Sequence, residues 1–206
     1  MIPENSGKIY RFKMDHGLGF GFAEVYDFTD HSMFDGRFIF VYSRIDQTEK
    51  KKYDIGKIRS STIALGPITL YKFPNVRGLH AWKYLFKSDD FMIKEIPETK
   101  YFRGFAPKES NWDNLTEWYR RSDIETRIKY SEARSLETRI LHSSMGVIEQ
   151  FSMMRLIELN KSVCDYYNLS EAGSRNMFIH LVNTYYPLEK ARKLLKALPD
   201  KVIYNY

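Results

Sequence analysis

The sequence predicts an α+β protein in which a small SH3-like β-barrel, or a curled antiparallel sheet, precedes a mostly helical C-terminal part. Three observations predict this fold class. Aromatic residues make up 16% of the 206 residues, and aromatic side chains favour half-buried pleated surfaces. Short apolar segments alternate with Gly- and Pro-containing turns in the first half of the chain. From Val147 onward, apolar residues instead recur with the spacing of amphipathic helices.

Residues 1–105 are predicted to form the β-rich, barrel-like domain. Turn residues separate its apolar segments, as in a small barrel or a curled sheet. The strands expected there are 7–13, 20–25, 38–43, 61–65, 68–73, 82–86 and 91–96. Every residue of the segment Phe38–Tyr42 is apolar or aromatic, which indicates a central strand packed on both faces.

The glycines of residues 17–21 are spaced like those of a phosphate-binding loop. Such a loop requires a helix immediately after it, so that the helix N-terminal amides face the anion. Residues 22–26 continue as a strand instead. We therefore interpret these glycines as relief of crowding in a strongly bent strand.

Residues 106–121 are interpreted as an aromatic connecting segment, and residues 122–206 as a mainly α-helical region. The segment Ser122–Glu125 matches a capping box, which predicts a helix start. Further helices are expected over 147–157, 174–185 and 187–198. Residues 133–142 fit either a helix or a strand, and residues 202–204 fit a final edge strand.

The chain has a formal charge of +6, and its two halves carry equal net charge. No apolar stretch approaches the length of a membrane span, so we expect no membrane partner. Glu4 stands where a secretory signal has positive charge, and a single cysteine fits a reducing compartment. These features predict a cytoplasmic protein.

Residue types used in catalysis and metal binding are scattered along the chain. The five histidines show no ligand spacing, and Cys164 has no nearby His or Cys partner. Asp165 disfavours a reactive thiolate at Cys164, which we interpret as a buried structural cysteine. We therefore predict no enzyme, no metal and no cofactor.

Nucleic-acid binding by the barrel is the alternative function. Aromatic and basic residues interleave around Phe38–Tyr42, as in RNA-binding sheets. The strand is expected to be central and buried, which would cover its aromatic side chains. Acidic residues surround Lys50–Lys52, as is typical of a solvated loop, so both features disfavour nucleic-acid binding. The residues that would bind nucleic acid are Arg37, Arg44, Lys50, Lys51, Lys52 and Arg59.

Two opening segments carry a resemblance to a known family. Gly7–Phe12 (GKIYRF) and Gly19–Val25 (GFGFAEV) resemble the first hairpin of the immunity protein 26 family. Trp82-Lys83 and Leu136–Arg139 are similar in kind, so the resemblance covers residues 7–140. It implies a small β-barrel-containing protein encoded beside a bacterial polymorphic toxin.

The resemblance implies a non-enzymatic binding protein that neutralises a cognate toxin by occluding it. Immunity proteins against nucleases are often acidic, because they cover basic clefts. Since this chain is basic overall, a local acidic patch or a toxin surface that is not strongly basic is required. The contact residues that we predict are the loop acids Asp27, Asp30 and Asp35, with Trp112 and Trp118 as aromatic anchors.

Overall fold

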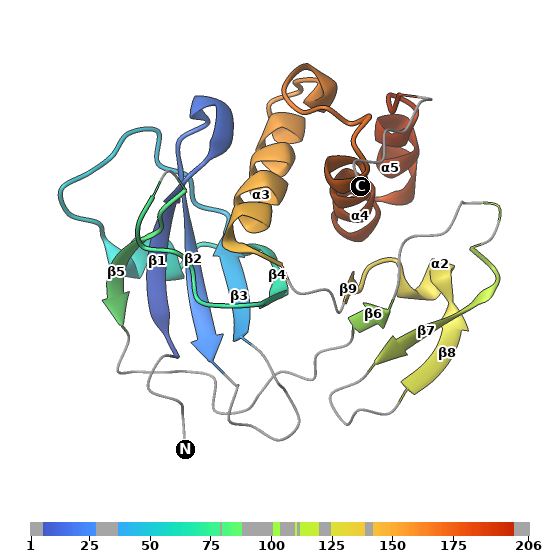
Figure 1. The fold of residues 1–206 in the computed structure, drawn as a ribbon, viewed down its shortest axis with the longest axis horizontal. Helices are drawn as coiled ribbons and strands as arrows, with labels where there is room; N and C mark the ends of the chain where they lie inside the picture. The colour runs from blue at the N-terminus through green and yellow to red at the C-terminus, as the bar shows by residue number, and fades with distance from the viewer. Residues whose placement is uncertain are drawn as a thin grey trace. The chain divides into compact units, whose positions relative to one another are not determined.

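The computed structural model is an α+β protein with one sheet in each of two compact units (Figure 1). The first unit comprises residues 1–99, 121–123 and 140–151, and the second comprises residues 100–120, 124–139 and 152–206. The structure describes residues 6–27, 37–78, 80–87, 101–103, 110, 112–119, 125–138 and 142–199. In this described part, no helix is long and apolar enough to cross a membrane.

The first unit is built on a five-stranded antiparallel sheet in the order β4-β3-β2-β1-β5. Its strands are β1 (Lys8–Lys13), β2 (Phe20–Asp27), β3 (Arg37–Tyr42), β4 (Ile63–Leu70) and β5 (Lys83–Lys87). Strands β1 to β4 form a meander, and β5 returns to pair with β1. The predicted turn at Gly66-Pro67 is a register shift within β4, where Leu65 and Ile68 pair with Val41 and Ile39. The strand predicted at 91–96 lies outside the described residues.

One face of this sheet packs with the first half of α3 (Ser144–Glu158). Phe12 stacks on the fully buried Trp82 at 4.6 Å between ring centroids and meets Phe151 edge-on at 5.8 Å. Gly21 pairs with Phe12 across β1 and β2, and a Cβ on it would lie 2.5 Å from the Phe12 ring. The segment 17–21 therefore leads into a strand, and the prediction that glycine relieves crowding there is confirmed at Gly21.

The opposite face is covered by α1 (Ile55–Arg59), whose N-cap Asp54 accepts a hydrogen bond from the Lys57 amide. The helix buries Ile58 against Ile9, Phe22 and Tyr42. The central position predicted for Phe38–Tyr42 is confirmed, because β3 lies between β2 and β4.

The second unit has a four-stranded sheet in the order β8-β7-β6-β9. Its strands are β6 (Tyr101–Arg103), β7 (Leu115–Tyr119), β8 (Glu125–Lys129) and β9 (Glu137–Thr138). The helix start predicted at Ser122–Glu125 is wrong, because Glu125 begins β8 and pairs with Tyr119 of β7. The segment 106–121, predicted as a connection, contributes β7 to this sheet.

The helices of the second unit follow the sequence pattern more closely. After α2 (Tyr130–Ala133) and the second half of α3 come α4 (Ala172–Tyr185) and α5 (Leu188–Leu195). Two short 3-10 segments are η1 (Asp15–Gly17) and η3 (Val163–Asp165). Pro187, the first residue of the helix predicted over 187–198, is the N-cap of α5. The edge strand predicted at 202–204 lies outside the described residues.

Gly21→Ala tests the close packing between β2 and α3. The added methyl would meet the rings of Phe12 and Phe151, at 2.5 and 2.9 Å, so one of them must move. We expect the free energy of unfolding in urea to fall by about 1–3 kcal/mol. Gly56→Ala in α1 is the matched control: its nearest neighbour would be Asp54 at 3.4 Å, and stability should stay equal or rise slightly. Equal stability of both variants would contradict the packing described here.

Candidate functional site

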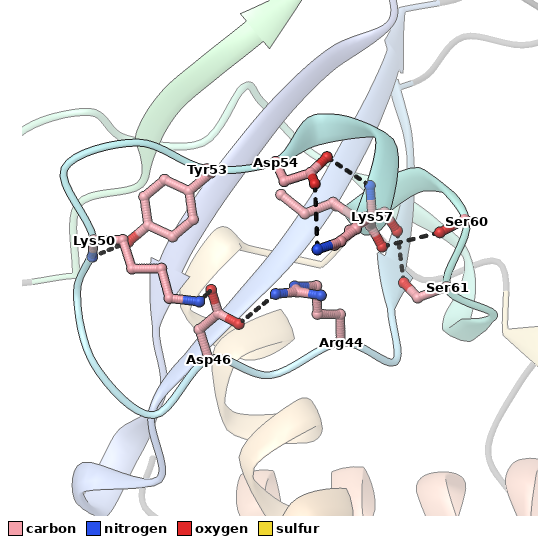
Figure 2. A network of polar contacts seen from close by, with 9 residues as sticks. Arg44, Asp46, Lys50, Tyr53, Asp54, Lys57, Ser60 and Ser61 are labelled. Atoms are coloured by element: carbon pink, nitrogen blue, oxygen red, sulfur yellow. Dashed lines mark hydrogen bonds and ion pairs between the residues drawn. The ribbon is translucent and has the colours of Figure 1, made fainter.

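A group of polar side chains in the first unit lies around α1 and the loop that precedes it. Asp46 lies buried in the loop between β3 and α1, and two cations bind its carboxylate (Figure 2). Arg44 Nη2 is 3.0 Å from Oδ1, and Lys50 Nζ is 2.9 Å from Oδ2. Backbone hydrogen bonds in both directions join Asp46 to Phe20, at 2.8 and 3.1 Å. The ion pairs therefore connect residues within the loop, and the backbone hydrogen bonds hold the loop to the start of β2.

Tyr53 joins the same loop to β1. Its hydroxyl oxygen accepts hydrogen bonds from Arg11 Nη1 at 2.9 Å and from the Lys50 amide at 3.0 Å. Arg11 also forms an ion pair with Glu49, and Lys83 Nζ lies 3.8 Å from the same carboxylate. The hydrogen bond from Arg11 lowers the pKa of Glu49. Burial lowers the pKa of Arg11, but the bonds to Tyr53 and Glu49 outweigh it and raise the net value.

Glu24 places a buried carboxylate at the centre of β2. The Tyr42 hydroxyl donates a hydrogen bond to Glu24 Oε2, and Arg59 Nη2 of α1 lies 3.6 Å from Oε1. Tyr26 shares a further side-chain hydrogen bond with this carboxylate. Burial raises the pKa of Tyr42 and of Tyr26, and the charge of Glu24 raises both further. Both hydroxyls therefore stay protonated and serve as donors to Glu24.

These contacts define what the arrangement can do. Taking a carboxylate out of water costs several kcal/mol unless cations and donors surround it, and Glu24 and Asp46 are each surrounded in this way. With pKa values raised above the ordinary tyrosine value, Tyr26 and Tyr42 remain protonated near neutral pH. The polar network holds the loop and α1 against the sheet and leaves a rigid scaffold.

Four of the six cations predicted to bind nucleic acid are paired with acidic residues inside the unit. Arg44 and Lys50 bind Asp46, and Arg59 lies beside Glu24. Arg37 Nε lies 3.6 Å from Asp27, and its guanidinium lies 4.7 Å above the Phe73 ring centroid. Lys51 and Lys52 are exposed. The cations act mainly as counter-ions of buried carboxylates.

The structure corrects two of the predicted toxin contacts. Asp27 is buried at the end of β2, where Ser6 Oγ accepts a hydrogen bond from its amide at 2.8 Å. Trp112 is buried against Tyr130, at 5.5 Å between ring centroids. Neither side chain is available as a surface contact in the folded chain. Asp30 and Asp35 lie outside the described residues, and Trp118 lies in β7 with its side chain outside them.

The prediction of a buried Cys164 is wrong. Cys164 is exposed in the short 3-10 turn Val163–Asp165, and its Sγ lies 3.4 Å from the Ala197 carbonyl oxygen. In that turn Val163, and not Cys164, faces the core of the second unit. A three-residue turn has too little length for periodicity to reveal which side chain points inward.

A second polar cluster ties β9 to α4 in the second unit. His180 Nε2 is 2.9 Å from Glu137 Oε2, and Thr184 Oγ1 is 3.3 Å from His180 Nδ1. In the neutral tautomer that satisfies both contacts, Nε2–H donates to Glu137 and Nδ1 accepts from Thr184. Thr184 follows His180 by one helical turn of α4, so the cluster locks β9 onto that helix.

Sequence reasoning missed the exposed aromatic pair on β5. The alternation of Trp82, Tyr84 and Phe86 indicated a strand, but it could not show which rings are covered. Trp82 is fully buried, whereas Tyr84 and Phe86 are 48% and 42% exposed. Lys83 and Lys87 at the two ends of β5 were the available signal, because lysines are typical of edge strands.

Comparison with family models, curated proteins and solved structures finds no match to this chain. Among the residues that the structure describes, no three His, Cys, Asp or Glu side chains are placed to hold a metal ion.

Tyr42→Phe tests the buried tyrosine–carboxylate contact through its pH dependence. Because folding raises the pKa of Tyr42, the unfolded chain loses this proton first. The Tyr42 hydroxyl therefore contributes fully to the free energy of unfolding below pH values of about 10, the pKa of a tyrosine in the unfolded chain. This contribution declines as the pH rises further. The free energy of unfolding of Tyr42→Phe, measured in urea from pH 9 to 12, should fall less steeply than that of the wild type, by at most about 1.4 kcal/mol per pH unit.

The control is Tyr71→Phe, because the Tyr71 side chain is 69% exposed in the folded chain. Its pH profile should follow the wild type. If Tyr42→Phe follows the wild type as well, the Tyr42 hydroxyl does not donate to a buried carboxylate.

Proposed function

We propose that this chain is a non-enzymatic binding protein of the immunity protein 26 kind, which neutralises a cognate bacterial toxin by occluding it. The resemblance over residues 7–140 supports this function. An SH3-like barrel is supported by the strand order, in which a four-stranded meander is followed by a fifth strand that returns to β1. The hairpin of β1 and β2 contains both segments that carry the resemblance.

The observation that carries the proposal is the aromatic pair Tyr84 and Phe86 on β5. Large exposed aromatic side chains are typical of residues that dominate the binding energy of protein interfaces. β5 pairs with β1, and the Tyr84 ring lies 6.0 Å from that of the buried Tyr10. Because the strand is already ordered, binding through this pair loses little conformational entropy.

The paired cations weigh against nucleic acid as the principal partner. A phosphate-binding surface gathers several cations whose charge is available to the backbone of the nucleic acid. Four of the six candidate cations instead lie beside Asp27, Asp46 or Glu24. Protein binding through β5 is therefore favoured over nucleic-acid binding by the barrel.

Tyr84→Ser combined with Phe86→Ser tests the aromatic pair as the contact surface. We expect the full chain to capture one nuclease-resistant protein partner from a lysate of its source organism, in equal stoichiometry by light scattering. Loss of two central aromatic contacts should weaken the measured Kd of that complex by about 30-fold or more. Ile63→Ser is the control, since Ile63 is 46% exposed on β4 at the other edge of the sheet.

Two results would contradict the proposal. Captured material that disappears after nuclease treatment would favour the nucleic-acid alternative. A partner that binds the double variant as tightly as the wild type would place the interface elsewhere on the chain.

A further inference from the structure

We infer that Tyr10 is a positioning residue for partner binding, because its buried ring holds the exposed ring of Tyr84 in one orientation. The inference rests on the proposed function, in which Tyr84 is a contact residue. Tyr10 lies in β1 and is 6% exposed, whereas Tyr84 lies in β5 and is 48% exposed. A partner can therefore contact Tyr84 directly, and Tyr10 acts through that ring.

The register between β1 and β5 brings the two rings together. Tyr10 pairs directly with Tyr84, whereas Ile9 pairs with Phe86, and the register shifts between these two pairs. Leu85 is the extra residue at this bulge, and a bulge changes the direction of the side chains beside it. Tyr84 therefore lies on the sheet face of Tyr10, and Phe86 lies on the face of Ile9. Of the two exposed rings of β5, Tyr84 is the one that Tyr10 supports.

Tyr10 can orient Tyr84 because its own ring rests on a fixed neighbour. The Tyr10 ring meets the Trp82 ring edge-on at 6.3 Å between centroids, and it meets the Tyr84 ring edge-on at 6.0 Å. Trp82 is fully buried, its amide donates a hydrogen bond to the Asn75 carbonyl at 2.7 Å, and its ring stacks on Phe12. Edge-to-face ring pairs are favoured at these separations. A continuous series of ring contacts therefore connects the core to the surface ring of Tyr84.

The restraint on Tyr84 has a consequence for affinity. An exposed side chain that rotates freely loses conformational entropy when a partner fixes it, and this loss weakens binding. A ring that a contact already holds in place loses less. Half of the Tyr84 side chain lies in solvent, so its contact with Tyr10 supplies a restraint that its surface position lacks. The Tyr10 ring thus increases affinity without touching the partner.

The orientation of Tyr84 is measured on the full-length chain without any partner, by the N–Cγ and C′–Cγ scalar couplings that report the χ1 rotamers of its side chain. The wild type and Tyr10→Phe, which keeps the ring, should each show one rotamer. Tyr10→Leu, which removes the ring, should show couplings averaged over several rotamers. Couplings that are the same in Tyr10→Leu and in the wild type would overturn the inference.

Affinity is then measured with the nuclease-resistant protein captured from the lysate. Tyr10→Leu should raise the Kd by about 3- to 10-fold, as expected for the lost restraint on one side chain, and Tyr10→Phe should raise it by less than about twofold. In a chain that already carries Tyr84→Ser, adding Tyr10→Leu should leave the Kd unchanged, because no ring remains to be held.

Phe38→Leu is the control for a general loss of buried aromatic packing. Phe38 is buried in β3, which β2 and β1 separate from β5. Its substitution should leave the Kd at the wild-type value. The inference is overturned if Phe38→Leu weakens binding as much as Tyr10→Leu does, or if Tyr10→Leu costs the same affinity with and without the Tyr84 ring.

The two measurements separate this inference from the proposed function. A partner whose Kd depends on Tyr84 but not on Tyr10 supports the binding protein and contradicts the positioning role. Failure to capture any protein partner contradicts the proposed function, while the couplings of Tyr84 still decide whether Tyr10 orients its ring.

Discussion

The buried carboxylate of Glu24 is the constraint on which the first unit depends. It lies at the centre of β2 and is buried on the sheet face that α1 covers. Folding is favourable only if groups from other segments surround it. Tyr42 comes from β3 and Arg59 comes from α1, and their convergence on Glu24 brings α1 onto the sheet. The apolar contacts of Ile58 then close over Ile9 and Phe22.

The same constraint limits what the loop cations can bind. Asp46 repeats the arrangement of Glu24 in the neighbouring loop, with Arg44 and Lys50 as its counter-ions. Cations that neutralise buried carboxylates are largely cancelled in the net charge of the chain and are not part of a phosphate-binding surface. The rings of Tyr84 and Phe86 lie outside this network, on a strand at the edge of the sheet. The surface available for recognition is therefore aromatic, with lysines at its ends.

The sequence predicted the strands and helices whose own pattern of apolar residues shows how they are buried. The uninterrupted apolar run Phe38–Tyr42 identified a central strand, and the helical spacing of apolar residues identified α3, α4 and α5. The prediction failed where a distant segment decides the structure. Ser122–Glu125 has the residues of a capping box, but pairing with β7 makes Glu125 the start of a strand. The sequence placed Asp27 in an exposed loop, but Asp27 is buried beside Arg37 of the neighbouring strand. Trp82 and Tyr84 alternate along one strand, but only the Trp82 ring is buried.

The central claim is that β5 makes the contact and that the charged loop is internal scaffold. Hydrogen exchange of the chain, alone and saturated with its captured partner, tests this claim most directly by mass spectrometry of peptides covering both regions. The account predicts that protection on binding is concentrated in Lys83–Lys87 and that exchange in residues 43–54 is unchanged. Protection of residues 43–54, with Lys83–Lys87 exchanging as in the free chain, would contradict it.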